Sequence, residues 1–160
     1  MKNPEPIMET IEIIPYSPEL QPAFEQINKE WVIQHFSLEP FDVMQLENPE
    51  KHILSKGGAI LFAKEGKEII GTVGLVKMEE GVYEMIKMGV RPKAQGKKVG
   101  QMLVKAILEK AKEMGAKKVV LYSNSKLEAA LNIYRKFGFR ELVPECGKYL
   151  RCDIKMEIEL

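Results

Sequence analysis

The sequence contains few of the residues that mark a zinc protein or a disulfide-rich secreted domain. Its 160 residues include two cysteines, two histidines and one tryptophan. Cys146 and Cys152 have no metal-binding spacing, and neither His35 nor His52 lies near a cysteine cluster. We therefore expect no bound metal, and we expect reduced thiols rather than a disulfide across a hairpin.

Long apolar runs and a dominant charge are also missing. No run reaches the roughly 18 apolar residues of a membrane span, and residues 1–6 lack the apolar core of a signal peptide. The formal net charge of +1 gives no broad field for nucleic acid or an anionic membrane. These absences predict a cytoplasmic protein that binds neither, and the basic residues between Arg91 and Lys118 suit one small polyanion.

The chain has the size and composition of one well-packed domain. With 45% hydrophobic and 29% charged residues, it is too short for two typical domains. We expect a single domain over residues 1–160, with residues 1–8 as a loose tail. Hydrophobic periodicity and turn residues predict strands at 10–15, 59–63, 68–77, 82–90, 118–122 and 149–160, and helices at 18–36, 41–47, 49–55, 96–114 and from a cap at 123–125 to 137.

These elements define a fold class. The strand, helix, strand unit over residues 82–122 implies a right-handed crossover and therefore one parallel pair, whereas the preceding strands form an antiparallel meander. We predict an α/β (α+β) fold with a mixed, mostly antiparallel sheet flanked by helices.

The stretch from residue 88 to residue 101 has the features of an anion site. It passes from an apolar strand, ended by Pro92, through a basic loop into a long amphipathic helix. Gly96 and Gly100 allow close approach of the backbone to a ligand, and Lys97 and Lys98 add positive charge to a helix start with unpaired N–H groups. A phosphate there is typically favoured by about 0.3–1 kcal/mol. The spacing fits neither G-x-x-x-x-G-K-[ST] nor G-x-G-x-x-G.

Two segments carry a family resemblance. Residues 95–100 resemble the Q/R-x-x-G-x-G/A signature of the GNAT superfamily of acyl-CoA-dependent N-acyltransferases, with Lys98 in place of the usual glycine at the fourth position. Residues 130–139 resemble the A-x-x-x-Y-x-K-x-G-F segment that closes the same cofactor site. The two segments occur in the family's order and at about its usual separation.

The resemblance implies a GNAT-like fold and acetyl-CoA as the acetyl donor. In the family, the loop amides hold the pyrophosphate and the pantetheine arm lies along the preceding strand. The corresponding cofactor-binding residues are Met88, Gly89, Val90, Gln95, Gly96, Lys97, Lys98, Val99, Gly100, Gln101 and Asn124. Gly89 is expected to leave room for the arm or to form a strand bulge, and Asn124 to bond the pantetheine amides or simply to cap a helix.

Two residues are candidates for catalysis. Glu84 matches the strand position of a catalytic glutamate in some family members, and an apolar strand face suits a general base. It could equally end its strand in solvent or pair with a lysine, with water as the base. Tyr134 matches the family tyrosine that protonates the departing sulfur, whereas by composition alone it would be a packing residue.

The expected function is transfer of an acetyl group from acetyl-CoA to a primary amine, by direct attack in a ternary complex. The alternative is a non-catalytic module of the same fold that senses CoA. A small-molecule amine and a protein amine stay open as acceptors, and so does a homodimer. Trp31, His35 and Phe36 are expected in the core, without a role at the site.

Overall fold

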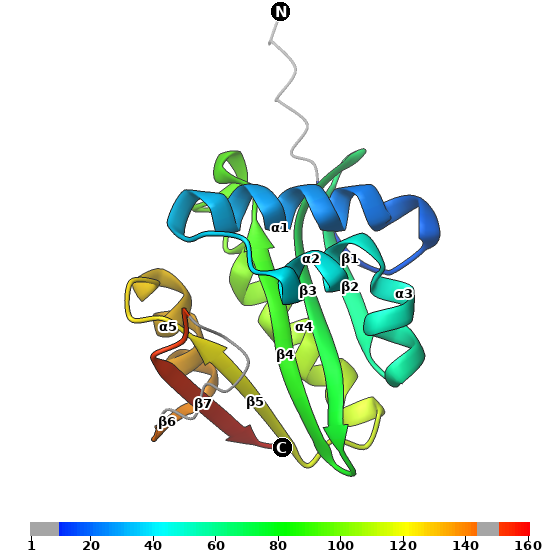
Figure 1. The fold of residues 1–160 in the computed structure, drawn as a ribbon. Coiled ribbons are helices and arrows are strands. Elements are labelled where there is room, and N and C mark those ends of the chain that lie inside the picture. The colour runs from blue at the N-terminus through cyan, green and yellow to red at the C-terminus, as the bar shows by residue number, and fades with distance from the viewer. Residues whose placement is uncertain (1–9, 144–150) are drawn as a thin grey trace, which may run out of the picture.

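The computed structural model describes residues 10–143 and 151–160. The expected loose tail over residues 1–8 lies outside the described residues, and so do Cys146 and the first residues of the strand expected at 149–160. Figure 1 shows one mixed sheet with helices on both faces.

The sheet has the order β1-β2-β3-β4-β5-β7-β6. Its strands are β1 (Ile11–Pro15), β2 (Ala59–Glu65), β3 (Glu68–Glu79), β4 (Val82–Val90), β5 (Lys118–Ser123), β6 (Arg140–Leu142) and β7 (Ile154–Glu159). Strands β1 to β4 form the expected antiparallel meander, and β4 pairs with β5 in parallel. The predicted fold class is thereby confirmed.

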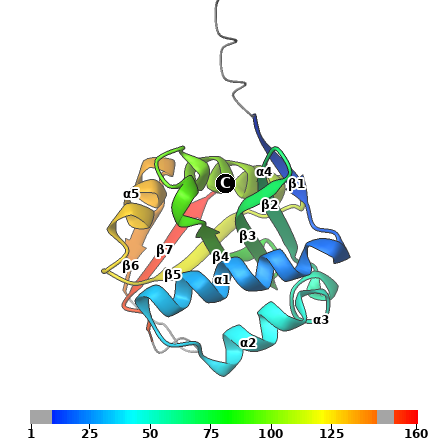
Figure 2. The ribbon, with the colours of Figure 1, turned by 90° about the horizontal axis from the view of Figure 1, so that it is seen from above.

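Helices cover the two faces of this sheet unequally, as Figure 2 shows. One face carries α1 (Gln21–His35), α2 (Pro40–Glu47) and α3 (Pro49–His52), with short 3₁₀ turns η1 (Pro18–Leu20) and η2 (Leu54–Lys56) beside them. The other face carries α4 (Val99–Glu113) and α5 (Glu128–Phe137). A further 3₁₀ turn, η3 (Pro92–Ala94), connects β4 to the loop that enters α4.

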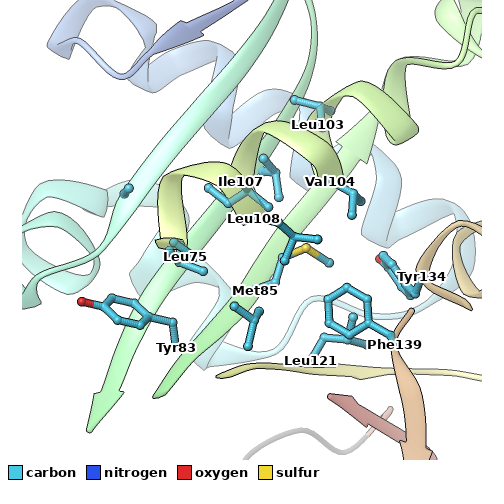
Figure 3. Packing of buried hydrophobic residues seen from close by; sticks show 14 of the residues in the cluster. Leu75, Tyr83, Met85, Leu103, Val104, Ile107, Leu108, Leu121, Tyr134 and Phe139 are labelled. Atoms are coloured by element: carbon cyan, nitrogen blue, oxygen red, sulfur yellow. The ribbon is translucent and has the colours of Figure 1, made fainter. Parts of the chain in front are cut away.

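The larger core lies between α4 and the sheet (Figure 3). Apolar residues recur on α4 at helical spacing, so one stripe of that helix meets the strands. Leu103, Val104 and Ile107 on this stripe are fully buried against residues such as Leu75 and Leu121. Each such side chain contributes about 1.5–3 kcal/mol through its burial, which fixes α4 and therefore its N-terminus relative to β4.

A second, smaller core lies on the opposite face beneath α1. It contains Phe24 from α1, Leu46 from α2 and Phe62 from β2, all with no exposed surface. Phe24 meets Phe62 edge-on with ring centroids 6.4 Å apart. This core holds the α1–α3 layer against β4 and its neighbours.

Strands β4 and β5 pair only at their beginnings. Residues 82–84 pair with residues 118–120, after which β5 continues alongside β7 while β4 continues alongside β3. Figure 1 shows the two strands separating toward their carboxyl ends. A bulge accompanies this separation, because Val73 of β3 faces both Lys87 and Met88, and Lys87 adopts a φ of 53°.

Several local predictions were wrong. The helix expected from residue 96 begins at Val99, because Gly96 and Lys98 have positive φ angles. The N-cap of α5 is Leu127 rather than a residue at 123–125. The three-residue strand β6 was missed because it is too short for an alternating pattern. Cys152 was expected as a reduced thiol but is disulfide-bonded, because the redox state of a thiol depends on which groups the fold brings near it, and cysteine spacing does not reveal them.

Candidate active site

A cavity of about 630 Å³ lies where β4 and β5 separate. This volume is typical of a small-molecule site. Its walls come from both faces of the sheet, because the gap between the two strands connects them. The lining residues discussed below are Trp31, His35, Phe36, Glu84, Lys87, Met88, Gly89, Val90, Gln95, Gly96, Lys98, Val99, Gly100, Gln101, Asn124, Lys126, Tyr134 and Arg151.

One end of the cavity is the N-terminus of α4. The first hydrogen bond of this helix runs from the N–H of Met102 to the carbonyl of Lys98, and the backbone N–H groups of residues 98–101 have no acceptor among the described residues. Such unpaired donors at the positive end of a helix bind phosphate oxygens. Gly96 leaves this end open, since a Cβ at that residue would have no atom within 4 Å.

The two lysines of the loop differ in position. Lys98 lines the cavity, whereas Lys97 does not. The Nζ of Lys97 lies 2.9 Å from Oε1 of Glu65 at the end of β2. The Lys97 side chain is therefore directed away from the cavity, by an acidic partner more than 30 residues away in the sequence, and a role of Lys97 in cofactor binding through its backbone stays a prediction.

Residues Met88, Gly89 and Val90 all line the cavity, as expected. The surroundings of Gly89, however, match neither of the two roles expected for it. A Cβ at Gly89 would point at Ile27 and Asn28 of α1 with ordinary contacts of 3.4 and 3.5 Å, so this glycine is not needed to make room in the gap. The bulge lies at Lys87 and Met88, one position earlier.

Glu84 lies at the point where the strands part. It belongs to the last parallel pair, opposite Val120, and only 1% of its surface is exposed. The alternative of a solvent-exposed strand end is therefore wrong. Glu84 also acts electrostatically on the Lys87 ammonium three residues along the strand, so pairing with a lysine is part of its environment.

Tyr134 projects from α5 into the same cavity and is buried. Its ring meets Phe139 edge-on, with centroids 5.8 Å apart (Figure 3). Burial raises the pKa of the Tyr134 hydroxyl above its ordinary value, so the group stays protonated at neutral pH. The hydroxyl has no hydrogen-bond partner in residues 10–143 or 151–160, which leaves it available to a ligand.

Asn124 lines the cavity, but its side-chain amide is engaged within the protein. The amide nitrogen donates to the carbonyl of Arg151 at 2.6 Å, and Oδ1 accepts from the N–H of Lys126 at 2.9 Å. Asn124 therefore fixes the turn after β5 to the segment before β7. It does not cap α5, which begins four residues later.

An aromatic wall faces the catalytic candidates across the cavity. Trp31, His35 and Phe36, at the end of α1, lie with ring centroids 5.4–6.4 Å apart and line the cavity. They were expected in the core, and that expectation is wrong. Apolar periodicity cannot distinguish a stripe that meets the sheet from one that continues past it over a cavity.

A buried ionic cluster lies behind this end of the cavity, and nothing in the local sequence predicts it. Asp42 of α2, with 1% of its side chain exposed, accepts from Lys87 at 2.5 Å and from both terminal nitrogens of Arg151 at 2.7 and 2.9 Å. Burial by itself raises the pKa of the Asp42 carboxyl. The hydrogen bond from Arg151 and the charge of Lys87 outweigh burial and hold that pKa well below its usual range.

Comparison with known proteins places the chain in a family. The model of the Acetyltransferase (GNAT) family matches residues 20–139. YvbK, an uncharacterized N-acetyltransferase of Bacillus subtilis, is 30% identical over 105 residues, which cover 64% of this chain and 68% of YvbK. An uncharacterized N-acetyltransferase of Schizosaccharomyces pombe, C1271.07c, is 31% identical over 118 residues, or 72% of each chain.

Solved structures share the fold. An acetyltransferase of the GNAT family from Staphylococcus aureus Mu50 has a TM-score of 0.85 at 23% identity, covering 94% of this chain and 99% of that one. YncA of Salmonella typhimurium, solved with its cofactor acetyl-CoA, has a TM-score of 0.77 at 18% identity, covering 94% of each.

The chain belongs to the GNAT family of acetyltransferases, and it is an acetyl-CoA-dependent acetyltransferase. The free amides at the start of α4 and the open edge of β4 suit the pyrophosphate and the amide-bearing arm of this donor. The alternative of a non-catalytic module is therefore not retained. Within the described residues, no helix is long and apolar enough to cross a membrane.

Proposed function

We propose that this enzyme transfers an acetyl group from acetyl-CoA to a primary amine by direct attack, with both substrates bound in one ternary complex. The observation that carries the proposal is the single cavity at the separation of β4 and β5. It extends from the free amides of α4, past Glu84 and Tyr134, to the aromatic wall of α1. Donor and acceptor can therefore enter from different ends and meet between the two candidates.

The residues of the loop and of β4 would hold the donor. Backbone N–H groups of residues 98–101 bind the pyrophosphate, and the unpaired edge of β4 after Glu84 offers main-chain groups to the pantetheine arm. Acetyl-CoA supplies an acetyl group activated as a thioester. Lys98 would add a positive charge beside the phosphates, whereas Lys97 is already paired with Glu65.

Glu84 is the proposed general base. An ordinary alkyl amine is neutral in roughly one molecule in a thousand or fewer at pH 7, so an acceptor ammonium must lose a proton before it can attack. The Glu84 carboxylate takes this proton, directly or through a water molecule, at the position where β4 and β5 part. The amine nitrogen then bonds to the acetyl carbon and loses its second proton to solvent as the carbon–sulfur bond breaks. Solvent also takes the proton held by Glu84 and returns one to Tyr134 after that residue has protonated the sulfur.

Tyr134 is the proposed general acid. As the carbon–sulfur bond breaks, the electron pair goes to sulfur, and the Tyr134 hydroxyl donates a proton or hydrogen bond to it. The raised pKa of the phenol keeps this proton on the Tyr134 oxygen until negative charge develops on the departing sulfur. The contact with Phe139 positions the ring.

We also propose that the enzyme is cytoplasmic and that residues 1–160 form a single domain. A small-molecule amine or a protein amine is the acceptor, and a homodimer is compatible with the proposed reaction.

The test of the acid role is Tyr134→Phe, which keeps the ring and removes the hydroxyl. Turnover, measured as thiol release from acetyl-CoA with a pool of amines, should fall about 10² to 10⁴-fold, the usual range for a general acid, while CoA affinity changes much less. Tyr83→Phe is the matched control, because Tyr83 is equally buried but does not line the cavity. Full activity in a folded Tyr134→Phe protein would contradict the acid role.

The base role is tested by the pH–rate profile of Glu84→Gln. Loss of the titrating carboxylate should flatten the acidic limb of the profile and lower turnover. An unchanged profile would leave water or the substrate's own ionisation as the base.

A further inference from the structure

The acceptor end of the cavity has an unequal distribution of charge. Three cationic side chains line it, and they come from three separate segments: Lys87 from the β4 bulge, Lys126 from the turn after β5, and Arg151 from the segment before β7. The carboxylates among the cavity-lining residues are Glu84 of β4 and Glu128 at the start of α5. Around them stands the aromatic wall of α1.

The carboxylates that pair with two of these cations lie outside the cavity lining, with Asp42 buried and Glu39 partly buried. Asp42 and Glu39 belong to α2 and its N-cap, and neither lines the cavity. Arg151 Nη1 lies 2.6 Å from Oε2 of Glu39, and Asp42 bridges Arg151 and Lys87. The cluster therefore fixes the two cations in place before any ligand arrives.

Lys126, the third cation, lies with Arg151 beside the ring of Phe36. The Lys126 ammonium lies 5.7 Å from the centroid of the Phe36 ring, and the guanidinium carbon of Arg151 lies 5.9 Å from it. Lys126 forms no ion pair with the described part of the chain. Two cationic groups thus gather around one aromatic ring at the wall of the cavity.

Building on the proposed reaction, we propose that the acceptor is an amino acid, a molecule whose amine lies beside Glu84 and whose carboxylate lies between Lys126 and Arg151. A guanidinium and an ammonium that converge on one ring are suited to a carboxylate. The same cations repel a polyamine, whose several ammonium groups would have to share Glu84 and Glu128 with the three cations already there.

The test compares acceptors that share an amine and differ in charge. Phenylalanine, phenylalaninamide and spermidine are assayed as acceptors of the wild-type enzyme, because the aromatic wall suits a phenyl ring. We expect kcat/KM for phenylalanine to exceed that for phenylalaninamide by at least tenfold, and spermidine to be the poorest of the three. In Lys126→Met, the acid-to-amide ratio of kcat/KM should fall about tenfold. Lys105→Met, an exposed lysine of α4, is the control for loss of one charge and should leave the ratio unchanged.

Equal or better use of the amide or of spermidine would overturn the inference, and so would an unchanged ratio in Lys126→Met. Calorimetric titration of the protein–CoA complex with phenylalanine (the acid) and with phenylalaninamide (the amide) measures recognition of the carboxylate in the absence of turnover. If no amine is acetylated but the acid still binds more tightly than the amide, the proposed reaction fails, while the carboxylate site between Lys126 and Arg151 is supported. Equal affinities for acid and amide would overturn the inference whatever the turnover.

Discussion

Lys98 occupies a backbone conformation that usually belongs to glycine. Its φ of 62° and ψ of 25° place it in the left-handed region at the N-cap of α4. The resemblance has glycine at this position, and the conformation explains why. A side chain there costs roughly 1–2 kcal/mol of backbone strain. The side chain itself is exposed, so it does not fill the loop.

Replacing Lys98 by glycine should therefore stabilise the protein. The backbone strain that glycine relieves in the folded state is larger than the free energy that glycine costs by adding conformational entropy to the unfolded chain. We therefore expect the free energy of unfolding to rise by about 0.5–1 kcal/mol in urea titrations. CoA affinity should change by less than tenfold, because the backbone N–H remains. Lys105→Gly in the middle of α4 is the opposite control and should destabilise by about 1 kcal/mol. A gain of more than tenfold in CoA affinity for Lys98→Gly would show that the lysine obstructs the loop.

Sequence motifs predicted the donor end of the cavity and the two catalytic candidates, but not the chemistry of its acceptor end. Every expected cofactor-binding residue except Lys97 lines the cavity. Lys87 and Arg151 were missed because their partner Asp42 lies 45 and 109 positions away, and charged residues at such separations carry no local pattern. The ion pair of the Lys97 side chain was missed for the same reason, since Glu65 lies 32 positions before it.

At the scale of elements, Gly100 sets the distance between α4 and α5. A Cβ at this position would lie 3.0 Å from Cδ1 of Ile133, so a larger residue pushes on the helix that carries Tyr134. The added atom points at α5 rather than toward the free amides. Gly100 therefore matters to the site through helix packing as well as through its N–H group.

We expect Gly100→Val to lower CoA affinity at least tenfold in calorimetric titrations, and to lower the melting temperature. The double variant Gly100→Val, Ile133→Ala removes the obstructing methyl group and should recover most of both losses. A stable double variant that still binds CoA poorly would contradict this explanation and place the ligand directly against Gly100.

The sheet order was predictable at this scale because each long element has its own period and a clear end. β4 was predicted over the residues that the structure assigns to it, and the crossover through α4 made its pairing with β5 parallel. The first residue of α4 and the N-cap of α5 were not predicted correctly, because the backbone angles of the preceding loops determine them. The bulge at Lys87 depends on pairing with β3, which no single strand reveals.

Over the whole molecule, the Asp42 cluster joins three distant segments. It connects α2, the β4 bulge and the segment before β7 through ion pairs. The low pKa of Asp42 in the folded state makes this connection depend on pH. A carboxyl group whose pKa is depressed by folding stabilises the protein fully above its unfolded pKa of about 3.9, and this stability is lost as the pH falls.

Asp42→Asn should consequently lose about 3 kcal/mol or more of unfolding free energy at pH 7, because Lys87 is left buried with a weaker partner. The deficit relative to wild type should narrow below about pH 4, where the wild-type carboxylate begins to lose its advantage. Urea titrations between pH 3 and pH 7 measure both effects, and Glu109→Gln on the exposed face of α4 is the control. A deficit of the same size across that range would rule out ionisation of Asp42 as its cause.

The separation of β4 from β5 also determines what kind of molecule can enter. Proteins usually have to protect strand edges at the outside of a sheet, where another chain could add itself. Here residues 85–90 present an edge inside the sheet, beneath α1 on one face and α4 on the other. A polypeptide strand carries side chains on both faces and would collide with those helices. A thin, flexible chain with amide groups and no side chains fits along the edge of β4 between the two helices. The helices therefore admit such a chain and exclude a polypeptide strand.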